Sequence, residues 1–227
     1  MGHTERPRLE EVWGGNDVML QSRYNTLYMK NILSFIDKPK IAIEYGVYKG
    51  GTFELLGEYA DIVYGIDSYF FVKEDISSFV SQWVHPRMKS GWELEICDVR
   101  QSKKVNSLEN ESVDIVHYDA GRDRNTTQST VDIFFDKLTD RSIVAFDNLQ
   151  LTPLDNLFSM LSGYNKLLPF GLTVDKDRRG KVYCAKTEEF TQEYRARMEE
   201  WKTETFNGIQ CVYQKEGMSY VKNDPRY

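Results

Sequence analysis

The segment IAIEYGVYKGGTFELLGEYADIVYGID, residues 41–67, contains two short apolar runs that are separated by a glycine turn and a stretch of helical spacing. The runs at 41–46 and 62–67 have the length and apolar content of buried strands, and residues 52–60 carry apolar side chains at helical intervals. This order of strand, turn, helix and strand predicts a βαβ unit with parallel strands and a right-handed crossover.

The alternation continues on both sides of this unit. Helices are predicted at 18–36, 74–83, 127–138 and 153–164, and strands at 92–98, 113–119 and 141–147. Residues 172–186 then contain two short strands joined by a charged turn, a connection that only antiparallel strands allow. A charged helix over 188–205 and a strand within 208–216 follow.

These elements predict a single α/β domain. Its doubly wound, seven-stranded sheet is mostly parallel and ends in a C-terminal antiparallel hairpin. We divide the chain into an N-terminal helical segment over 1–39, a core over 40–187 and a C-terminal extension of the same domain over 188–227.

Composition narrows the functional classes. The chain has 227 residues, of which 41% are hydrophobic, and a formal net charge of −6, which argues against a general phosphate-backbone binder. No apolar run is long enough for a membrane span or a signal peptide, so we expect a soluble, cytoplasmic protein without nucleic-acid or membrane partners. Three widely spaced cysteines favour neither a disulfide framework nor a zinc site.

Acidic residues lie at the carboxyl end of every predicted parallel strand. Ligands of open parallel sheets bind outside the carboxyl ends of the strands, where Glu44 is followed by a glycine turn and Asp67 could accept hydrogen bonds from a ribose diol. The other strand ends carry Asp98, Asp119, and Asp147 with Asn148. Each residue alone also suits a tight turn or a helix cap. Together they predict a bound cation or a hydroxyl-rich ligand, because converging carboxylates repel one another.

Two familiar nucleotide-binding patterns are absent. The glycines at 46, 50 and 51 do not form G-x-G-x-x-G, and the chain has no G-K-[ST] sequence. With these two patterns excluded, the sequence favours another fold that binds a nucleoside through its ribose.

The stretch EYGVYKGGT, residues 44–52, resembles the E-x-G-x-x-x-G-x-[ST] loop of class I S-adenosylmethionine-dependent methyltransferases. It looks like the loop of the subgroup that includes macrocin O-methyltransferase-like and cephalosporin hydroxylase-like proteins, and the resemblance extends over about residues 18 to 186. It implies a Rossmann-like fold and S-adenosylmethionine as the cofactor. The cofactor-binding residues that it implies are Glu44, Tyr45, Gly46, Tyr48, Gly50, Gly51, Thr52, Asp67, Ser68, Asp98 and Asp119.

A second resemblance concerns a metal. The stretch VDIVHYDAGRD, residues 113–123, is followed by FDN at 146–148, and this pairing resembles the catechol O-methyltransferase-type metal site. The resemblance implies that Asp119, Asp147 and Asn148 hold Mg²⁺, which prefers oxygen ligands. Such an ion lowers the pKa of a coordinated hydroxyl and orients it towards the methyl group.

The general base remains open. Relatives carry His or Lys three residues after the first metal-binding Asp, where this chain has Arg122, whose guanidinium stays protonated. Asp123, His85 and His117 are the candidates, although His117 also suits an ordinary buried position in a strand and His85 a surface loop. Arg122 could instead bind a carboxylate or phosphate of the substrate.

The sequence thus predicts an S-adenosylmethionine-dependent, Mg²⁺-assisted O-methyltransferase that acts on a small hydroxylated molecule, such as a sugar, a phenol or a natural product. The alternative is a protein that keeps the cofactor fold but performs other chemistry, hydroxylase-like, or only binds. The stripe of Phe190, Tyr194, Met198 and Trp201 packs either on the chain's own sheet or in a homodimer.

Overall fold

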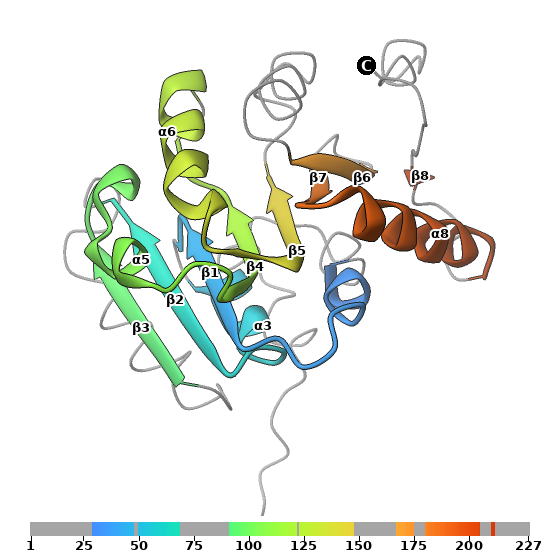
Figure 1. Ribbon diagram of the computed structural model, residues 1–227, viewed down its shortest axis with the longest axis horizontal. Coiled ribbons are helices and arrows are strands. Elements are labelled where there is room, and N and C mark those ends of the chain that lie inside the picture. The colour runs from blue at the N-terminus through green and yellow to red at the C-terminus, as the bar shows by residue number, and fades with distance from the viewer. Residues whose placement is uncertain are drawn as a thin grey trace, which may run out of the picture.

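One mixed sheet runs through the computed structural model, which describes residues 29–47, 50–68, 91–121, 123–147, 167–174, 180–204 and 210–211 (Figure 1). Its strands are β1 (Ile41–Tyr45), β2 (Ile62–Asp67), β3 (Gly91–Ile96), β4 (Val113–Tyr118), β5 (Leu138–Phe146), β6 (Leu168–Val174), β7 (Gly180–Ala185) and β8 (Gln210–Cys211). The helices are α3 (Gly51–Leu56), η2 (Val99–Gln101), α5 (Lys103–Ser107), α6 (Arg124–Phe135) and α8 (Glu188–Glu204).

The strand order is β3-β2-β1-β4-β5-β7-β6-β8. Strands β1 to β5 pair in parallel, whereas β7 is antiparallel to both β5 and β6. The predicted fold class is therefore confirmed: seven strands form the doubly wound, mostly parallel sheet with its C-terminal hairpin. The two-residue β8 pairs with β6 and lies within the stretch predicted as a last strand.

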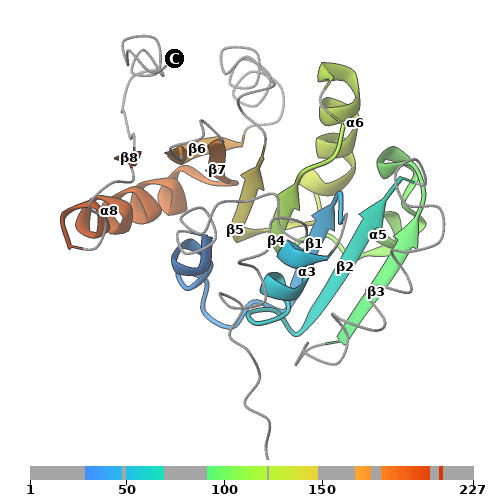
Figure 2. The same ribbon diagram turned by 180° about the vertical axis from the view of Figure 1, so that it is seen from behind.

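Helices cover both faces of the sheet. Figure 1 shows α5 and α6 on one face, and Figure 2 shows α3 on the other. The first face buries Val105 of α5 with Val131 and Phe134 of α6. The second buries α3 together with residues 29–36 and Tyr194 of α8. Residues from all three predicted parts of the chain thus share one core cluster on this second face.

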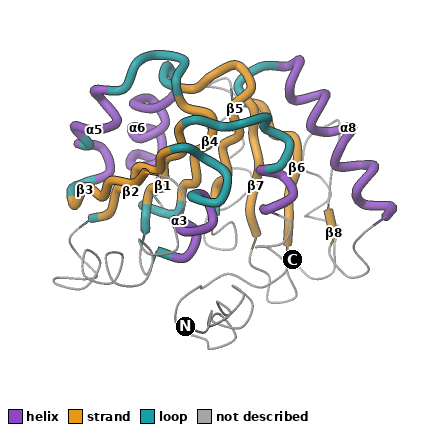
Figure 3. The backbone as a smooth tube through the Cα atoms, turned by 90° about the horizontal axis from the view of Figure 1, so that it is seen from below, coloured by secondary structure: helices purple, strands orange, loops and turns teal. Residues whose placement is uncertain are grey.

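The C-terminal helix α8 packs beside β6 and β7, at the opposite end of the sheet from β3 (Figure 3). Tyr194 is fully buried, stacks on Phe35 and donates a hydrogen bond to the Arg141 carbonyl at 2.6 Å. Phe190 packs partly buried against the same cluster. The first half of the apolar stripe therefore lies on the chain's own core, and a homodimer stays a prediction.

Several boundaries differ from the predicted ones for local reasons. Helix α6 begins at Arg124 rather than 127, because the Asp123 side chain accepts a hydrogen bond from the Thr126 amide and caps the helix there. The first described helix ends at residue 33 instead of 36, and Lys38 adopts a positive φ of 54° in the turn that follows. The predicted helices at 74–83 and 153–164 lie outside the described residues.

Among the described residues, no helix combines the length and the apolar character that crossing a membrane requires.

Candidate functional site

The glycine turn after β1 brings the ends of β1 and β4 into contact. Gly46 has a φ of 86°, and its amide donates to the Ile66 carbonyl at 2.8 Å. A Cβ atom at this position would lie 2.2 Å from the backbone oxygen of Asp119, so only glycine is compatible with this approach. Gly50, with a φ of 81°, is the N-cap of α3 and turns the chain into the helix at the same edge.

Backbone hydrogen bonds continue past the strand ends and fix the acidic residues at this edge. The Asp119 amide donates to the Tyr45 carbonyl at 2.8 Å, and the Asp147 amide donates to the Tyr118 carbonyl at 2.9 Å. The carbonyl of Asp67 accepts from the Cys97 amide at 2.8 Å. The acids predicted from separate strands thus gather along one edge of the sheet, at the carboxyl ends of β1, β2, β4 and β5.

A buried chain of polar side chains crosses four adjacent strands at this edge. Glu44 of β1 is the direct partner of His117 in β4, and His117 Nδ1 lies 3.2 Å from Glu44 Oε1. On the other side of the ring, Nε2 lies 2.7 Å from Nζ of Lys181, which comes from β7. Lys181 Nζ also donates to Asp147 Oδ2 at 2.6 Å. Glu44, His117 and Lys181 are at most 2% exposed.

Burial and neighbouring charges set the protonation states in this chain. The pKa of Glu44 is raised well above its ordinary value, chiefly by burial and then by Asp119, while the Lys181 ammonium acts in the opposite direction. The pKa of His117 is lowered well below its ordinary value by burial and by Lys181. We therefore assign a neutral His117 whose Nε2 accepts from Lys181 and whose Nδ1–H donates to Glu44.

Lys181 was not among the predicted site residues. The stretch GKVYCA places Lys181 two and four residues before Tyr183 and Ala185, which are both fully buried. Val182 and Cys184, on the other face of β7, are fully buried as well. The available signal is therefore the apolar run that follows Lys181, which indicates a strand covered on both faces.

Other predicted residues have local partners. The Tyr45 side chain is fully buried on the face opposite Glu44, where its ring packs against those of Tyr118 and Phe134. Asp98 accepts three hydrogen bonds from Arg100, and these lower its pKa to about 2. Asp123, a candidate base, is the exposed cap of α6, and the hydrogen bonds of that cap lower its pKa. Ser68 is exposed and Thr52 is buried.

Four of the predicted site residues lie outside the described residues: Tyr48, His85, Arg122 and Asn148. Their assigned roles stay predictions. Within the described ranges, no three His, Cys, Asp or Glu side chains gather closely enough to hold a metal ion. Asp147, one of the predicted metal ligands, has the Lys181 ammonium on its Oδ2 atom.

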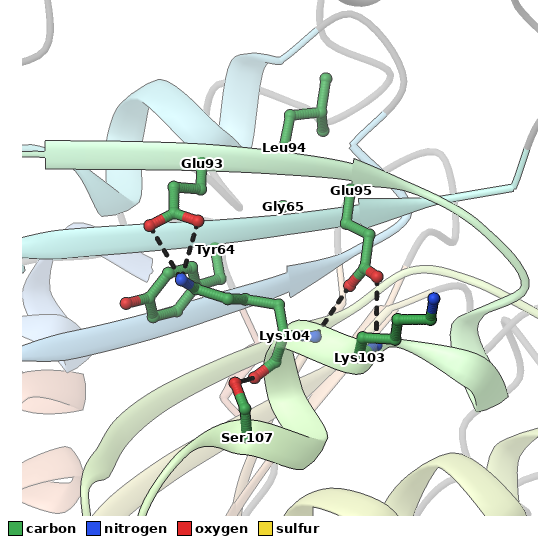
Figure 4. A pocket seen from close by; sticks show the side chains of 8 residues that line it. All are labelled: Tyr64, Gly65, Glu93, Leu94, Glu95, Lys103, Lys104 and Ser107. Carbon is green, nitrogen blue, oxygen red and sulfur yellow. Dashed lines mark hydrogen bonds and ion pairs between the residues drawn. The ribbon is translucent and has the colours of Figure 1, made fainter.

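A separate groove of about 450 Å³ lies at the β3 edge, between β2, β3 and α5 (Figure 4). Lys104 Nζ pairs with Glu93 at 2.8 Å above the ring of Tyr64. Glu95 accepts hydrogen bonds from the backbone amides of Lys103 and Lys104. Lys104 and Glu93 pair with each other, and Glu95 is held by backbone amides, so we assign no ligand to this groove.

Replacing Glu44 by Gln is expected to stabilise the fold above about pH 4.3, the ordinary pKa of a glutamate. Because the folded-state pKa of Glu44 is raised, its contribution to stability is complete below that value and is lost as the pH rises through the folded pKa. The gain at pH 8 should be on the order of 1–3 kcal/mol and should vanish near pH 4. Urea unfolding at both pH values measures it, with the exposed Glu109→Gln as control. A gain that is independent of pH would contradict this account of Glu44.

No protein-family model and no curated protein matches the sequence. Solved structures do match. The chain is similar to an rRNA methylase from Streptococcus thermophilus, with a TM-score of 0.56 and 14% identity over 75% of this chain and 99% of that one. It is similar to the N-methyltransferase NodS from Bradyrhizobium japonicum, solved with S-adenosyl-L-homocysteine, with a TM-score of 0.58 and 11% identity over 73% and 87%.

A third similar structure is geranyl diphosphate C-methyltransferase from Streptomyces coelicolor, solved with Mg²⁺, with a TM-score of 0.54 and 8% identity over 72% and 78%. One structure with this fold is an rRNA methylase, so the fold does not support the absence of a nucleic-acid partner that we expect from the sequence. The narrower resemblance to macrocin- and catechol-type enzymes stays a prediction. At these identities the likeness shows architecture alone: the chain has the fold of S-adenosylmethionine-dependent methyltransferases.

Proposed function

We propose that this protein is an S-adenosylmethionine-dependent methyltransferase. The observation that carries the proposal is the glycine turn between β1 and α3, which lies beside Asp67 at the carboxyl end of the adjacent strand β2. Gly46 and Gly50 allow the backbone to approach a ligand closely, and Asp67 supplies a carboxylate for ribose hydroxyls. When bound, the cofactor supplies an electrophilic methyl group on its sulfonium.

For the acceptor we propose a small hydroxylated molecule, a sugar, phenol or natural product, that is methylated on oxygen. Such a reaction needs a hydroxyl held in line with the methyl group and a group that takes its proton. His117 is poorly suited to take it, because both ring nitrogens already have partners in Glu44 and Lys181. His85 and Asp123 remain the proposed bases, of which Asp123 is the weaker base because its carboxylate caps α6 and has a lowered pKa. Arg122 remains the proposed contact for an acidic group of the substrate.

The residues at this edge do not fit the Mg²⁺ site that the sequence predicts, because Lys181 already supplies a positive charge at Asp147. We therefore propose no reaction step through a metal.

Incubation with labelled S-adenosylmethionine and a panel of hydroxylated acceptors, with and without chelator, tests the transfer. Because Asp123 caps a helix and His117 is engaged, we keep one alternative, a protein that binds the cofactor without methyl transfer. Cofactor binding with no labelled product from any acceptor would favour it.

Replacing Asp67 by Ala is expected to weaken S-adenosyl-L-homocysteine binding by about 1.5–3 kcal/mol, about ten- to hundredfold in Kd, because the ribose hydroxyls lose a charged acceptor. Isothermal titration calorimetry measures the change. Asp61→Ala is the matched control, since Asp61 is an exposed acid next to the other end of β2. Equal affinity in the Asp67 variant and the wild type would refute the assignment of this edge as the cofactor site.

A further inference from the structure

Lys181 is a fully buried lysine at the edge where the sequence predicts a divalent ion. It lies near the start of β7. Because β7 pairs antiparallel with β5, the start of β7 lies beside the carboxyl end of β5. Phe146 of β5 pairs with Val182, so the residue after Phe146, Asp147, comes beside Lys181. The two side chains are 0% and 8% exposed, and their charged atoms are 2.6 Å apart.

The hydrogen bonds of Lys181 define its role as a cation. An ammonium group has three N–H donors and no acceptor. One N–H is directed at Asp147 Oδ2 and another at His117 Nε2, 2.7 Å away. The Nδ1–H of His117 then donates to Glu44 Oε1. The Lys181 ammonium is thus hydrogen-bonded directly to Asp147 and, through His117, to Glu44. A deprotonated lysine would leave Asp147 in the interior without this positive partner.

A divalent ion at this position would compete with Lys181. Mg²⁺ binds carboxylate oxygens at about 2.0–2.1 Å and needs near-octahedral room, and a cation so close to the ammonium would be repelled in a buried setting. Lys181 already holds the Oδ2 atom of Asp147. Two positive groups therefore cannot both be well placed against Asp147.

We propose that the Lys181 ammonium is the resident cation of this site and takes the place of the divalent ion that the sequence predicts. The proposal rests on the proposed function in that it concerns the same cofactor-binding edge. A fixed ammonium offsets the mutual repulsion of Glu44, Asp119 and Asp147. The charge of Asp147 is then balanced without a divalent ion.

The test is a titration of the chelator-treated full chain with Mn²⁺, in which electron paramagnetic resonance follows the free ion. The wild type is compared with Lys181→Met and with Lys181→Met combined with Asp147→Asn. We expect no stoichiometric Mn²⁺ binding by the wild type. Lys181→Met should gain a site, because Asp147 then lacks its cation, and the double variant should lose that site again. If Lys181→Met does not fold, Lys181→Gln serves the same comparison.

Stoichiometric Mn²⁺ binding by the wild type that is lost on Asp147→Asn would overturn the proposal. A folded Lys181 variant that gains no Mn²⁺ site would overturn it as well, because the lysine would then be a structural residue only. Calorimetry with S-adenosyl-L-homocysteine on the same samples tests the proposed function separately from the role of Lys181. Absence of cofactor binding refutes the proposed function, whereas the Mn²⁺ titration without cofactor still decides the role of Lys181.

Discussion

Gly46→Ala should destabilise the fold by about 2–5 kcal/mol and abolish cofactor binding. A left-handed backbone costs a non-glycine residue about 1–2 kcal/mol, and forced overlap in a packed region adds about 1–3 kcal/mol. Gly46 has a φ of 86°, and the new methyl group would lie 2.2 Å from the Asp119 oxygen. The contact is with backbone, so the ends of β1 and β4 must separate. Equilibrium urea unfolding and calorimetry measure the two effects.

Gly91→Ala provides the control for this substitution. Gly91 begins β3 and is exposed, and a Cβ atom there would find its nearest neighbour, a side-chain carbon of Ile62, at 3.6 Å. This is an ordinary contact, so we expect a change within about 0.5 kcal/mol. Equal stability losses in the two variants would show that the close approach at Gly46 is not what holds the edge together.

Lys181→Met should lower the free energy of unfolding by about 3–5 kcal/mol, the usual cost of leaving a buried charge without its partner. Lys181 and Asp147 are 0% and 8% exposed, so water screens the pair little. Combining this change with Asp147→Asn should recover most of the loss, because the uncompensated carboxylate is gone. Urea unfolding of the four proteins in the cycle gives the coupling energy. Strictly additive losses would mean that the two groups do not interact.

The sequence determined the order of strands and helices because periodicity is a local property. The segment 41–67 has apolar runs of strand length on either side of a helical repeat, and the structure forms β1, α3 and β2 there. Parallel strands place their carboxyl ends at one edge, so the convergence of Asp67, Asp119 and Asp147 also followed from the sequence. Short elements did not: η2 and α5 have three and five residues, too few to display a period.

Tertiary structure alone decided how the charges at this edge are balanced. His117 lies 64 residues before Lys181 and 73 after Glu44, and the three meet because the strand order places β1, β4, β5 and β7 side by side. The local sequence predicts that Asp147 is an acid at a strand end that can bind a metal ion. In the folded chain, the Lys181 ammonium lies 2.6 Å from its Oδ2 atom. The physical reason is that periodicity fixes which way a side chain points, but pairing across strands fixes which charge it meets.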